Sequence, residues 1–290
     1  MHYVDAKSIL SANSGMHGMN IYRGCTHGCI YCDSRSTCYG FTHEFEDIEV
    51  KQNAPALLEA ALRSKRRVCM IGTGAMCDPY MHCERELQLT RQCLEIIKKY
   101  GFGIAIQTKS DMILRDIDLL DEINRQAKAV VQMTLTTYDD TLCGIIEPRV
   151  CNTKRRIEVL EAMRERGIPT MVWLSPILPF INDTEENIGA LLRECVRVGV
   201  KGIICFGTGV TLREGDREYF YAALDKHFPG LKERYIRTYG NAYELPSPDS
   251  PRLMRMINDV CEQNGILHTP ESCFAYLNDL PEKFEQTTLF

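Results

Sequence analysis

Several features that assign a chain to a membrane, to secretion or to a nucleic-acid surface are missing from this sequence. No apolar run among its 290 residues approaches the length of a membrane span. Its first ten residues, MHYVDAKSIL, lack the features of a secretory signal peptide. Positive charge is not in excess, since 34 Lys and Arg stand against 39 Asp and Glu, which argues against a strongly basic nucleic-acid-binding surface. We therefore expect a cytoplasmic protein without membrane contact, for which nucleic acid is a possible but not a favoured partner.

A disulfide framework is not expected of such a chain, so some of its 14 cysteines are predicted to bind metal or to catalyse. Three of them, Cys25, Cys29 and Cys32, fall within eight residues. Gly24 precedes the first and Gly28 lies between the first two, so this segment can fold around a small inorganic group. Because iron–sulfur clusters are normally held by four cysteines, three local thiolates leave one iron open for another ligand. The spacing predicts an iron–sulfur site with a free coordination position.

Two other metal assignments use the same residue types. A structural zinc site would need a fourth ligand from Cys38, His27 or His43, although zinc sites usually combine two Cys-X2-Cys elements. An auxiliary cluster would draw on more scattered cysteines that show no tight grouping, namely Cys38, Cys77, Cys83, Cys143, Cys151, Cys261 and Cys273. A binding or sensing module built on zinc or iron–sulfur is therefore the non-enzymatic alternative.

Short apolar runs alternate with amphipathic stretches along most of the chain, which is typical of a parallel sheet covered by helices. Strands are predicted at residues 19–22, 68–72, 103–107, 129–135, 170–174 and 202–206. Helices are predicted at residues 54–66, 83–100, 112–125, 153–166, 184–198 and 216–227. Six β–α units indicate an α/β fold with a partial (β/α)6 barrel of TIM type, because a closed barrel needs eight.

Three regions are expected on this basis. Residues 1–18 form an N-terminal lead-in, residues 19–228 form the partial barrel, and residues 229–290 form a C-terminal extension that packs on the barrel. The extension shows one clear helix at residues 250–264, and its last five residues are read as a docking tail or as disordered.

Polar residues of unusual type follow the predicted strands. In parallel barrels the active site lies at the C-terminal ends of the strands. Cys77 and Asp78 come after the second strand, Lys109 after the third, and Thr134 at the end of the fourth. Simpler readings exist, since Asp78-Pro79 can be a helix-initiating turn and Thr134 a residue of the barrel wall.

The cysteine loop, with Tyr31 directly before Cys32, resembles the signature of the radical S-adenosylmethionine (SAM) superfamily. Further motifs resemble the spore photoproduct lyase-like branch over about residues 19–183. They are Cys77-Asp78-Pro79-Tyr80, Thr108-Lys109-Ser110 with Ile113-Leu114-Arg115-Asp116, Glu147-Pro148 and Arg156.

The resemblance implies a [4Fe–4S] cluster on Cys25, Cys29 and Cys32, with SAM on the open iron. It also implies that Lys109 pairs with the SAM carboxylate and Thr134 reaches the ribose. The remaining predicted cofactor contacts are Tyr31, Cys77, Asp78 and Arg156. An external donor of the flavodoxin or ferredoxin type would reduce the cluster, and SAM would then yield a 5′-deoxyadenosyl radical that attacks the substrate.

The lyase reaction itself is matched less well. The position of the lyase's hydrogen-donating cysteine is Ala75 here, and that of its relay tyrosine is Asp33. Cys77 and Tyr31 are the residues that could take catalytic roles instead. The leading hypothesis is a radical SAM enzyme acting on an unidentified substrate, and the alternative is a lyase that reverses a thymine photoproduct in DNA.

Overall fold

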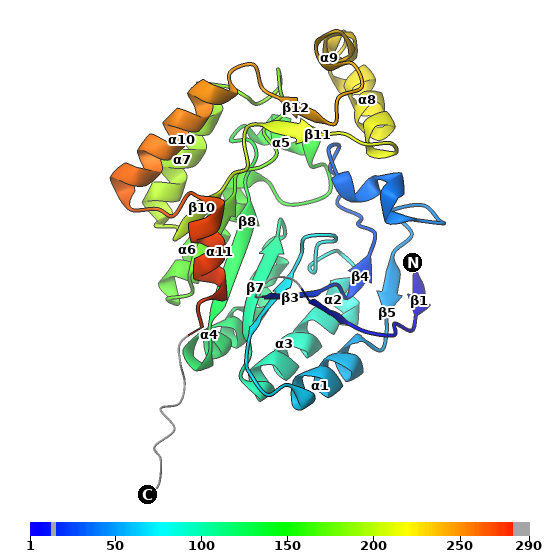
Figure 1. Ribbon diagram of the computed structural model, residues 1–290, viewed down its shortest axis with the longest axis vertical. Helices are drawn as coiled ribbons and strands as arrows, with labels where there is room; N and C mark the ends of the chain where they lie inside the picture. Colours follow the sequence, from blue (N-terminus) through cyan, green and yellow to red (C-terminus); the bar gives the residue numbers. More distant parts are fainter. Residues whose placement is uncertain (13–15, 281–290) are drawn as a thin grey trace, which may run out of the picture.

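A seven-stranded sheet forms the centre of the protein, whose computed structural model describes residues 1–12 and 16–280 (Figure 1). Six neighbouring strands run parallel in chain order, and β2 joins the edge antiparallel to β3. The strands are β2 Leu10–Ala12, β3 Met16–Met19, β6 Met70–Thr73, β7 Gly103–Thr108, β8 Ala129–Thr134, β9 Thr170–Trp173 and β10 Gly202–Ile204. This order without closure is that of a partial (β/α)6 barrel, which confirms the predicted fold.

Helices cover the outer face of the sheet because each presents one apolar stripe to it (Figure 1). They are α1 Ala54–Ser64, α3 Leu89–Tyr100, α4 Ile117–Gln126, α6 Thr153–Glu165 and α7 Glu185–Val198. Their stripes contribute fully buried leucines to one large core, among them Leu58, Leu94, Leu120, Leu160 and Leu191. The residues at and after the C-terminal ends of the strands are left to border the cavities described below.

The first strand differs from its prediction at residues 19–22. The barrel strand is β3, which ends at Met19, and Tyr22–Arg23 forms β4 in a second sheet of order β1-β5-β4. In that sheet β1 is His2–Val4 and β5 is Glu49–Lys51. Met19, Ile21 and Tyr22 are all buried, so hydropathy marked their burial correctly. It could not show that the run passes from one sheet to another.

The helix predicted at residues 83–100 is broken into α2 Glu84–Leu87 and α3 at Gln88, which has a left-handed backbone (φ 51°). The Glu84 carboxylate is fully buried and accepts hydrogen bonds from the backbone N–H groups of Thr90 and Arg91 at 3.1 and 3.4 Å. It thus satisfies donors of the first turn of α3, as a capping residue does.

Several short elements were not predicted. They are the 3-10 turns η1 Asp33–Arg35 and η2 Thr37–Tyr39, the helices α5 Asp140–Ile146, α9 Leu231–Tyr239 and α11 Pro270–Asn278, and the strands β11 Gly209–Thr211 and β12 Glu244–Pro246. The helix predicted at residues 112–125 begins as the 3-10 turn η3 Asp111–Asp116 and continues as α4. Helix α8 spans Asp216–His227, and α10 spans Ser250–Asn264 as predicted. No helix in residues 1–12 and 16–280 is long and apolar enough to cross a membrane.

The segment after residue 228 contacts the preceding part of the chain through several of its elements. Strand β12 pairs antiparallel with β11, α10 packs on α7, and α11 packs on β10 (Figure 1). The predicted C-terminal tail at residues 286–290 lies outside the described residues.

Candidate active site

The cysteine loop begins directly after β4 and is held by backbone hydrogen bonds on both sides. Cys25 N–H donates to Phe45 O at 3.3 Å, and Ile30 N–H donates to Ile146 O at 3.0 Å. Gly24 has φ +85°, and a Cβ on it would lie 2.3 Å from the same Phe45 oxygen. Only glycine allows the loop to approach this closely. The loop therefore presents its three cysteines in one orientation, along a small cavity of about 70 Å³.

The thiol groups of this inner cavity need a positive partner to ionise. Burial raises the pKa of Cys25, Cys29 and Cys32, that of Cys29 to about 12, and the nearby Lys109 charge works against this rise at Cys29 and Cys32. A metal group that binds thiolates would displace these protons. The site is therefore suited to hold a cationic cluster.

The spacing of the thiols fits a cluster better than a single zinc ion. Within the described ranges, the three cysteine sulfurs do not form a group whose ligand atoms all lie within 4.8 Å of one another. A tetrahedral zinc ion with Zn–S bonds of about 2.3 Å would bring its sulfurs to about 3.8 Å. Of the proposed fourth zinc ligands, only His27 borders the inner cavity, and its Nδ1 lies 3.4 Å from Asp78 Oδ2.

Lys109 and Thr134 border both the inner cavity and a larger outer one. Burial by itself disfavours the charged form of Lys109, but the nearby Cys29 and Glu147 outweigh it and raise the pKa of the lysine. No salt bridge joins Lys109 to a carboxylate in residues 1–12 and 16–280. The buried Thr134 hydroxyl likewise has no hydrogen-bond partner in these ranges. Both groups are thus free to bind a ligand.

Asp78 joins three loops of the site. Its Oδ1 accepts from the Thr108 hydroxyl at 2.7 Å and from Tyr80 N–H at 2.9 Å, and its Oδ2 accepts from Lys109 N–H at 2.8 Å. The loop after β6 is thereby tied to the loop after β7, beside His27 of the cysteine loop. Asp78 borders the inner cavity, and its hydrogen bond to Lys109 N–H fixes the backbone from which the lysine side chain extends.

Tyr31 borders both cavities with its ring and is anchored at its hydroxyl. The hydroxyl donates to the Glu147 carboxylate, which also pairs with Arg156 Nη1 at 2.6 Å. Glu147 and Arg156 have no exposed side-chain surface. Arg156, predicted to contact the cofactor, does not line either cavity and instead donates to the backbone oxygens of Cys151 and Thr134.

Cys77 borders the inner cavity only. Its thiol is buried and donates to Tyr22 O at 2.9 Å, and burial raises its pKa to about 12. Ala75, which stands where the lyase has its donor cysteine, lines both cavities. Cys32 is the one cysteine of the described chain that lines the outer cavity.

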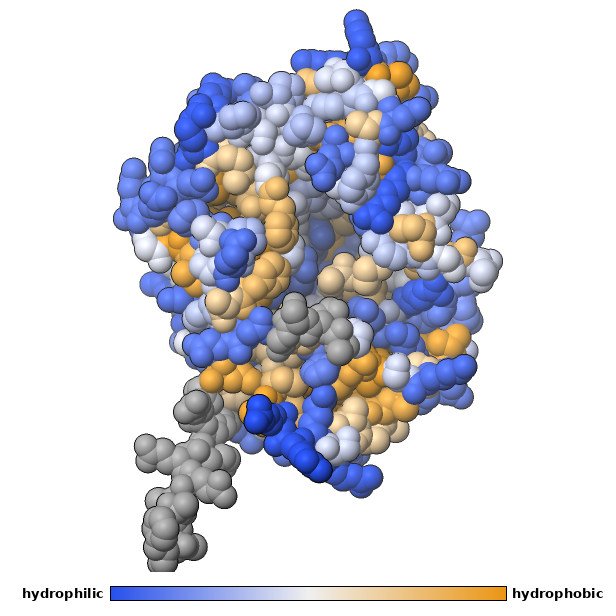
Figure 2. Space-filling view, viewed as in Figure 1, coloured by the Kyte–Doolittle hydropathy of each residue, from blue (hydrophilic) through white to orange (hydrophobic). Residues whose placement is uncertain are grey.

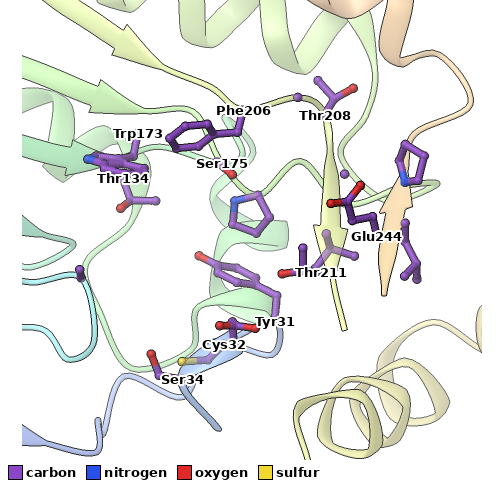
Figure 3. A pocket seen from close by; sticks show the side chains of 18 of the residues that line it. Tyr31, Cys32, Ser34, Thr134, Trp173, Ser175, Phe206, Thr208, Thr211 and Glu244 are labelled. Carbon is purple, nitrogen blue, oxygen red and sulfur yellow. The ribbon is translucent and has the colours of Figure 1, made fainter. Parts of the chain in front are cut away.

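The outer cavity has a volume of about 620 Å³ and lies against the inner one (Figure 3). One side of it is lined by the cysteine loop, through Tyr31, Cys32 and Ser34. Another side is lined by Thr208 just before β11, Thr211 of β11 and Glu244 of β12. The rings of Trp173 and Phe206 lie together above the strand ends, with centroids 5.9 Å apart. The surface is hollowed near the middle of this face (Figure 2).

Some of these residues escaped prediction. Trp173 lies in a predicted strand and Glu244 carries no motif, yet both line the outer cavity, and Glu244 is exposed. From the loops after β9 and β10, Ser175 and Thr208 line the outer cavity. Thr208 places an unpartnered buried hydroxyl there, counting the described residues.

Fold and site together define an open parallel barrel with a three-cysteine loop at the C-terminal ends of its strands. A family model described as the radical SAM superfamily matches residues 19–187. The chain belongs to the radical SAM superfamily. Enzymes of this superfamily use a [4Fe–4S] cluster and SAM, and need an electron donor and a substrate.

The chain is also similar to individual proteins. An uncharacterized protein of Mycobacterium tuberculosis H37Rv, Rv2578c, is 30% identical over 79% of this chain and 68% of its own length. The radical SAM Nalpha-GlyT isomerase of Pseudomonas phage M6 is 24% identical over 62% of this chain and 36% of its own. A spore photoproduct lyase variant with bound AdoMet and dinucleoside spore photoproduct superposes with a TM-score of 0.62, at 14% identity, over 87% of this chain and 75% of its own. This match confirms the resemblance in fold to the spore photoproduct lyase-like branch.

Proposed function

We propose that this enzyme holds its [4Fe–4S] cluster through Cys25, Cys29 and Cys32, and binds SAM where the inner and outer cavities meet. One observation carries the proposal: the cavity that the three thiols line shares Tyr31, Lys109 and Thr134 with the 620 Å³ cavity beside it. A ligand bound at this junction would contact the cysteine loop at one end and open space at the other.

The chain's own residues would position the reactants. Lys109 supplies the positive charge for a carboxylate, and the Thr134 hydroxyl is available to a ribose oxygen. Tyr31, anchored on Glu147, forms the wall between cluster loop and ligand. When reduced by a donor of the flavodoxin or ferredoxin type, the bound cluster and SAM supply a 5′-deoxyadenosyl radical. Trp173 and Phe206 place apolar surface against the outer cavity, which limits water near such a species.

We further propose that the substrate occupies the outer cavity and receives no hydrogen atom from a cysteine thiol, because the loop cysteines would hold the cluster as thiolates. Cys32 is the one cysteine that lines this cavity in the described residues, and the Cys77 thiol donates a hydrogen bond to the backbone oxygen of Tyr22. A lyase acting on a thymine photoproduct is the alternative, which the bound dinucleoside photoproduct of the similar lyase structure favours.

Anaerobic reconstitution tests the cluster and the SAM site. We expect about four irons per chain in the wild type and 5′-deoxyadenosine after addition of SAM and reductant. Cys29→Ala should lose iron and product while keeping its circular dichroism spectrum. Cys38→Ala is the matched control, because Cys38 is exposed and lines neither cavity. Full iron content in Cys29→Ala, or no product from an iron-loaded wild type, would refute the assignment.

A second assay distinguishes an unidentified substrate from a thymine photoproduct. The reconstituted enzyme is incubated with dinucleoside spore photoproduct, SAM and reductant. We expect 5′-deoxyadenosine without reversal of the photoproduct. Reversal that Cys77→Ala abolishes would establish the lyase reading and a catalytic Cys77.

A further inference from the structure

Two histidines and a glutamate converge on the three-stranded sheet β1-β5-β4, away from both cavities. His2 lies on β1, Glu49 on β5, and His43 on the segment that leads to β5. One ligand atom from each of the three lies within 4.8 Å of the others. The histidine rings meet edge to face with centroids 4.8 Å apart. The side chains of His43 and Glu49 are only 19% and 15% exposed, so they are held by packing.

Each imidazole is oriented by an oxygen that can only accept. His2 Nδ1 lies 3.0 Å from Asp47 Oδ2, and His43 Nδ1 lies 2.9 Å from the backbone oxygen of Glu44. Both Nδ1 atoms therefore carry the hydrogen, and in the neutral rings each Nε2 carries a lone pair. Metal-binding histidines are typically oriented in this way, by a carboxylate or a carbonyl on the other ring nitrogen.

Glu49 is fixed in a matching way. Arg23 Nη1 donates to Glu49 Oε1 at 2.7 Å, and Arg23 also donates to the backbone oxygens of Tyr39 and Gly40. His43 Nε2 lies 2.8 Å from the same Oε1. Oε2 has no hydrogen-bond partner among residues 1–12 and 16–280, which leaves it for another ligand. A lone pair on Nε2 and a carboxylate oxygen this close require a proton or a cation to bring them together.

We propose that His2, His43 and Glu49 bind one divalent first-row transition-metal ion, with Zn²⁺ as the expected occupant. Two imidazole nitrogens and one carboxylate oxygen form a ligand set that zinc accepts, with water in the fourth position. None of the three residues lines the inner or the outer cavity, so this site is separate from the cysteine loop.

The site would connect β1 to the segment around Phe45, which holds the cysteine loop by a backbone hydrogen bond. His43 and Glu49 flank Phe45, whose backbone oxygen accepts from Cys25 N–H. A bound ion would join β1 to this segment and limit its motion. The expected role is structural, and it predicts a higher Tm in the presence of the ion, since a ligand that binds only the folded state stabilises it.

Metal titration of the full chain tests the proposal. Because the cysteine loop can itself bind zinc, the titration compares the wild type with the Cys25→Ala/Cys29→Ala/Cys32→Ala variant. We expect the variant to bind one Zn²⁺ with a Kd below about 1 µM. His2→Ala and His43→Ala in this background should each weaken binding by at least about 100-fold, and Asp47→Asn by about 10- to 100-fold. Co²⁺ should give visible absorption without the intense near-ultraviolet bands of cobalt–thiolate bonds.

His17→Ala is the matched control, because His17 lies on β3 and contacts Ser11 and Lys65 instead. It should leave zinc affinity unchanged. If His43→Ala alters the fold, Glu49→Gln serves in its place, since it keeps an acceptor for Arg23. Zinc binding weaker than about 100 µM in the variant without the three loop cysteines would overturn the proposal. Binding that survives both His2→Ala and His43→Ala would also overturn it.

Discussion

At the scale of single residues, the site contains one charged side chain without an ion-pair partner among the described residues, Lys109, and one that is paired inside the protein, Glu147. Lys109 is oriented through its own backbone N–H, which donates to Asp78, while its ammonium group faces the junction of the two cavities. Glu147, by contrast, is neutralised by Arg156 behind the cavity wall. One charge is available to a ligand, and the other is used to hold Tyr31.

Lys109→Gln tests the first of these roles. A charge-assisted hydrogen bond contributes about 1.5–3 kcal/mol, so we expect SAM affinity to fall by about 10- to 100-fold. Iron content should stay at the wild-type level, because Lys109 is not a cluster ligand. Equilibrium dialysis with the reconstituted protein measures the affinity. Lys154→Gln, at an exposed position of α6, should bind SAM as the wild type does. Equal affinities in the two variants would exclude Lys109 from the SAM site.

Glu147→Gln tests the role of the buried ion pair between Glu147 and Arg156. Removing one partner of a buried ion pair leaves Arg156 uncompensated and should cost about 3–5 kcal/mol of unfolding free energy at pH 7. Burial favours the neutral carboxyl, but Arg156 and Lys109 outweigh it and lower the pKa of Glu147 below its usual 4.5. The wild type therefore loses this stabilisation as the pH falls from 4.5 through the folded-state pKa.

Urea unfolding at several pH values measures the effect. The difference between wild type and Glu147→Gln should be full above pH 4.5 and should narrow below it. Replacing both partners, in Glu147→Leu with Arg156→Met, should recover much of the loss. A stability difference that grows towards low pH would contradict the ion-pair account.

At the scale of elements, side chains decide boundaries that periodicity leaves open. The apolar spacing of residues 83–100 continues across Gln88, so it predicts one helix. The buried Glu84 carboxylate instead caps a new helix, and Gln88 adopts a left-handed backbone that costs an ordinary residue about 1–2 kcal/mol.

Gln88→Gly should therefore stabilise the protein by about 0.5–1 kcal/mol, because glycine adopts this backbone without strain. Gln92→Gly, four residues later at an exposed position inside α3, should destabilise it by about 1 kcal/mol. Thermal or urea unfolding of the two variants measures both changes in stability. A loss of stability in Gln88→Gly as large as that in Gln92→Gly would show that the helix is continuous.

At the scale of the whole molecule, segments far apart in the sequence enclose the outer cavity. The cysteine loop forms one side, the strand ends another, and the β11–β12 pair a third (Figure 3). Strand β12 belongs to the segment after residue 228. The same segment buries Leu253, Ile257 and Cys261 of α10 in the main core, and Cys273 and Leu277 of α11 against the sheet.

A chain that ends at residue 228 should consequently lose cooperative folding. It exposes the apolar faces of α7 and β10 that α10 and α11 cover. We expect binding of a hydrophobic dye and a broad thermal transition. A chain that ends at residue 280 keeps all of these contacts and is the control. A sharp transition at the wild-type Tm in the 228-residue chain would show that the extension is dispensable for folding.

Local sequence determined the features that depend on neighbouring residues. The spacing of Cys25, Cys29 and Cys32 defined the loop, and apolar runs buried on both faces defined five of the six parallel strands within a few residues. The polar strand ends that carry Lys109 and Thr134 followed from the rule for parallel barrels, because strand ends converge whatever the details of the helices.

Tertiary structure decided what depends on contacts between distant segments. Glu244 reaches the outer cavity only because β12 pairs with β11, and His2 meets His43 and Glu49 only because β1 pairs with β5. The hydrogen bond from Cys77 to Tyr22 and the burial of Arg156 on Glu147 likewise join residues 55 and 9 positions apart. Hydropathy records how deeply a residue is buried and not which partner it meets, so these arrangements follow from the fold alone.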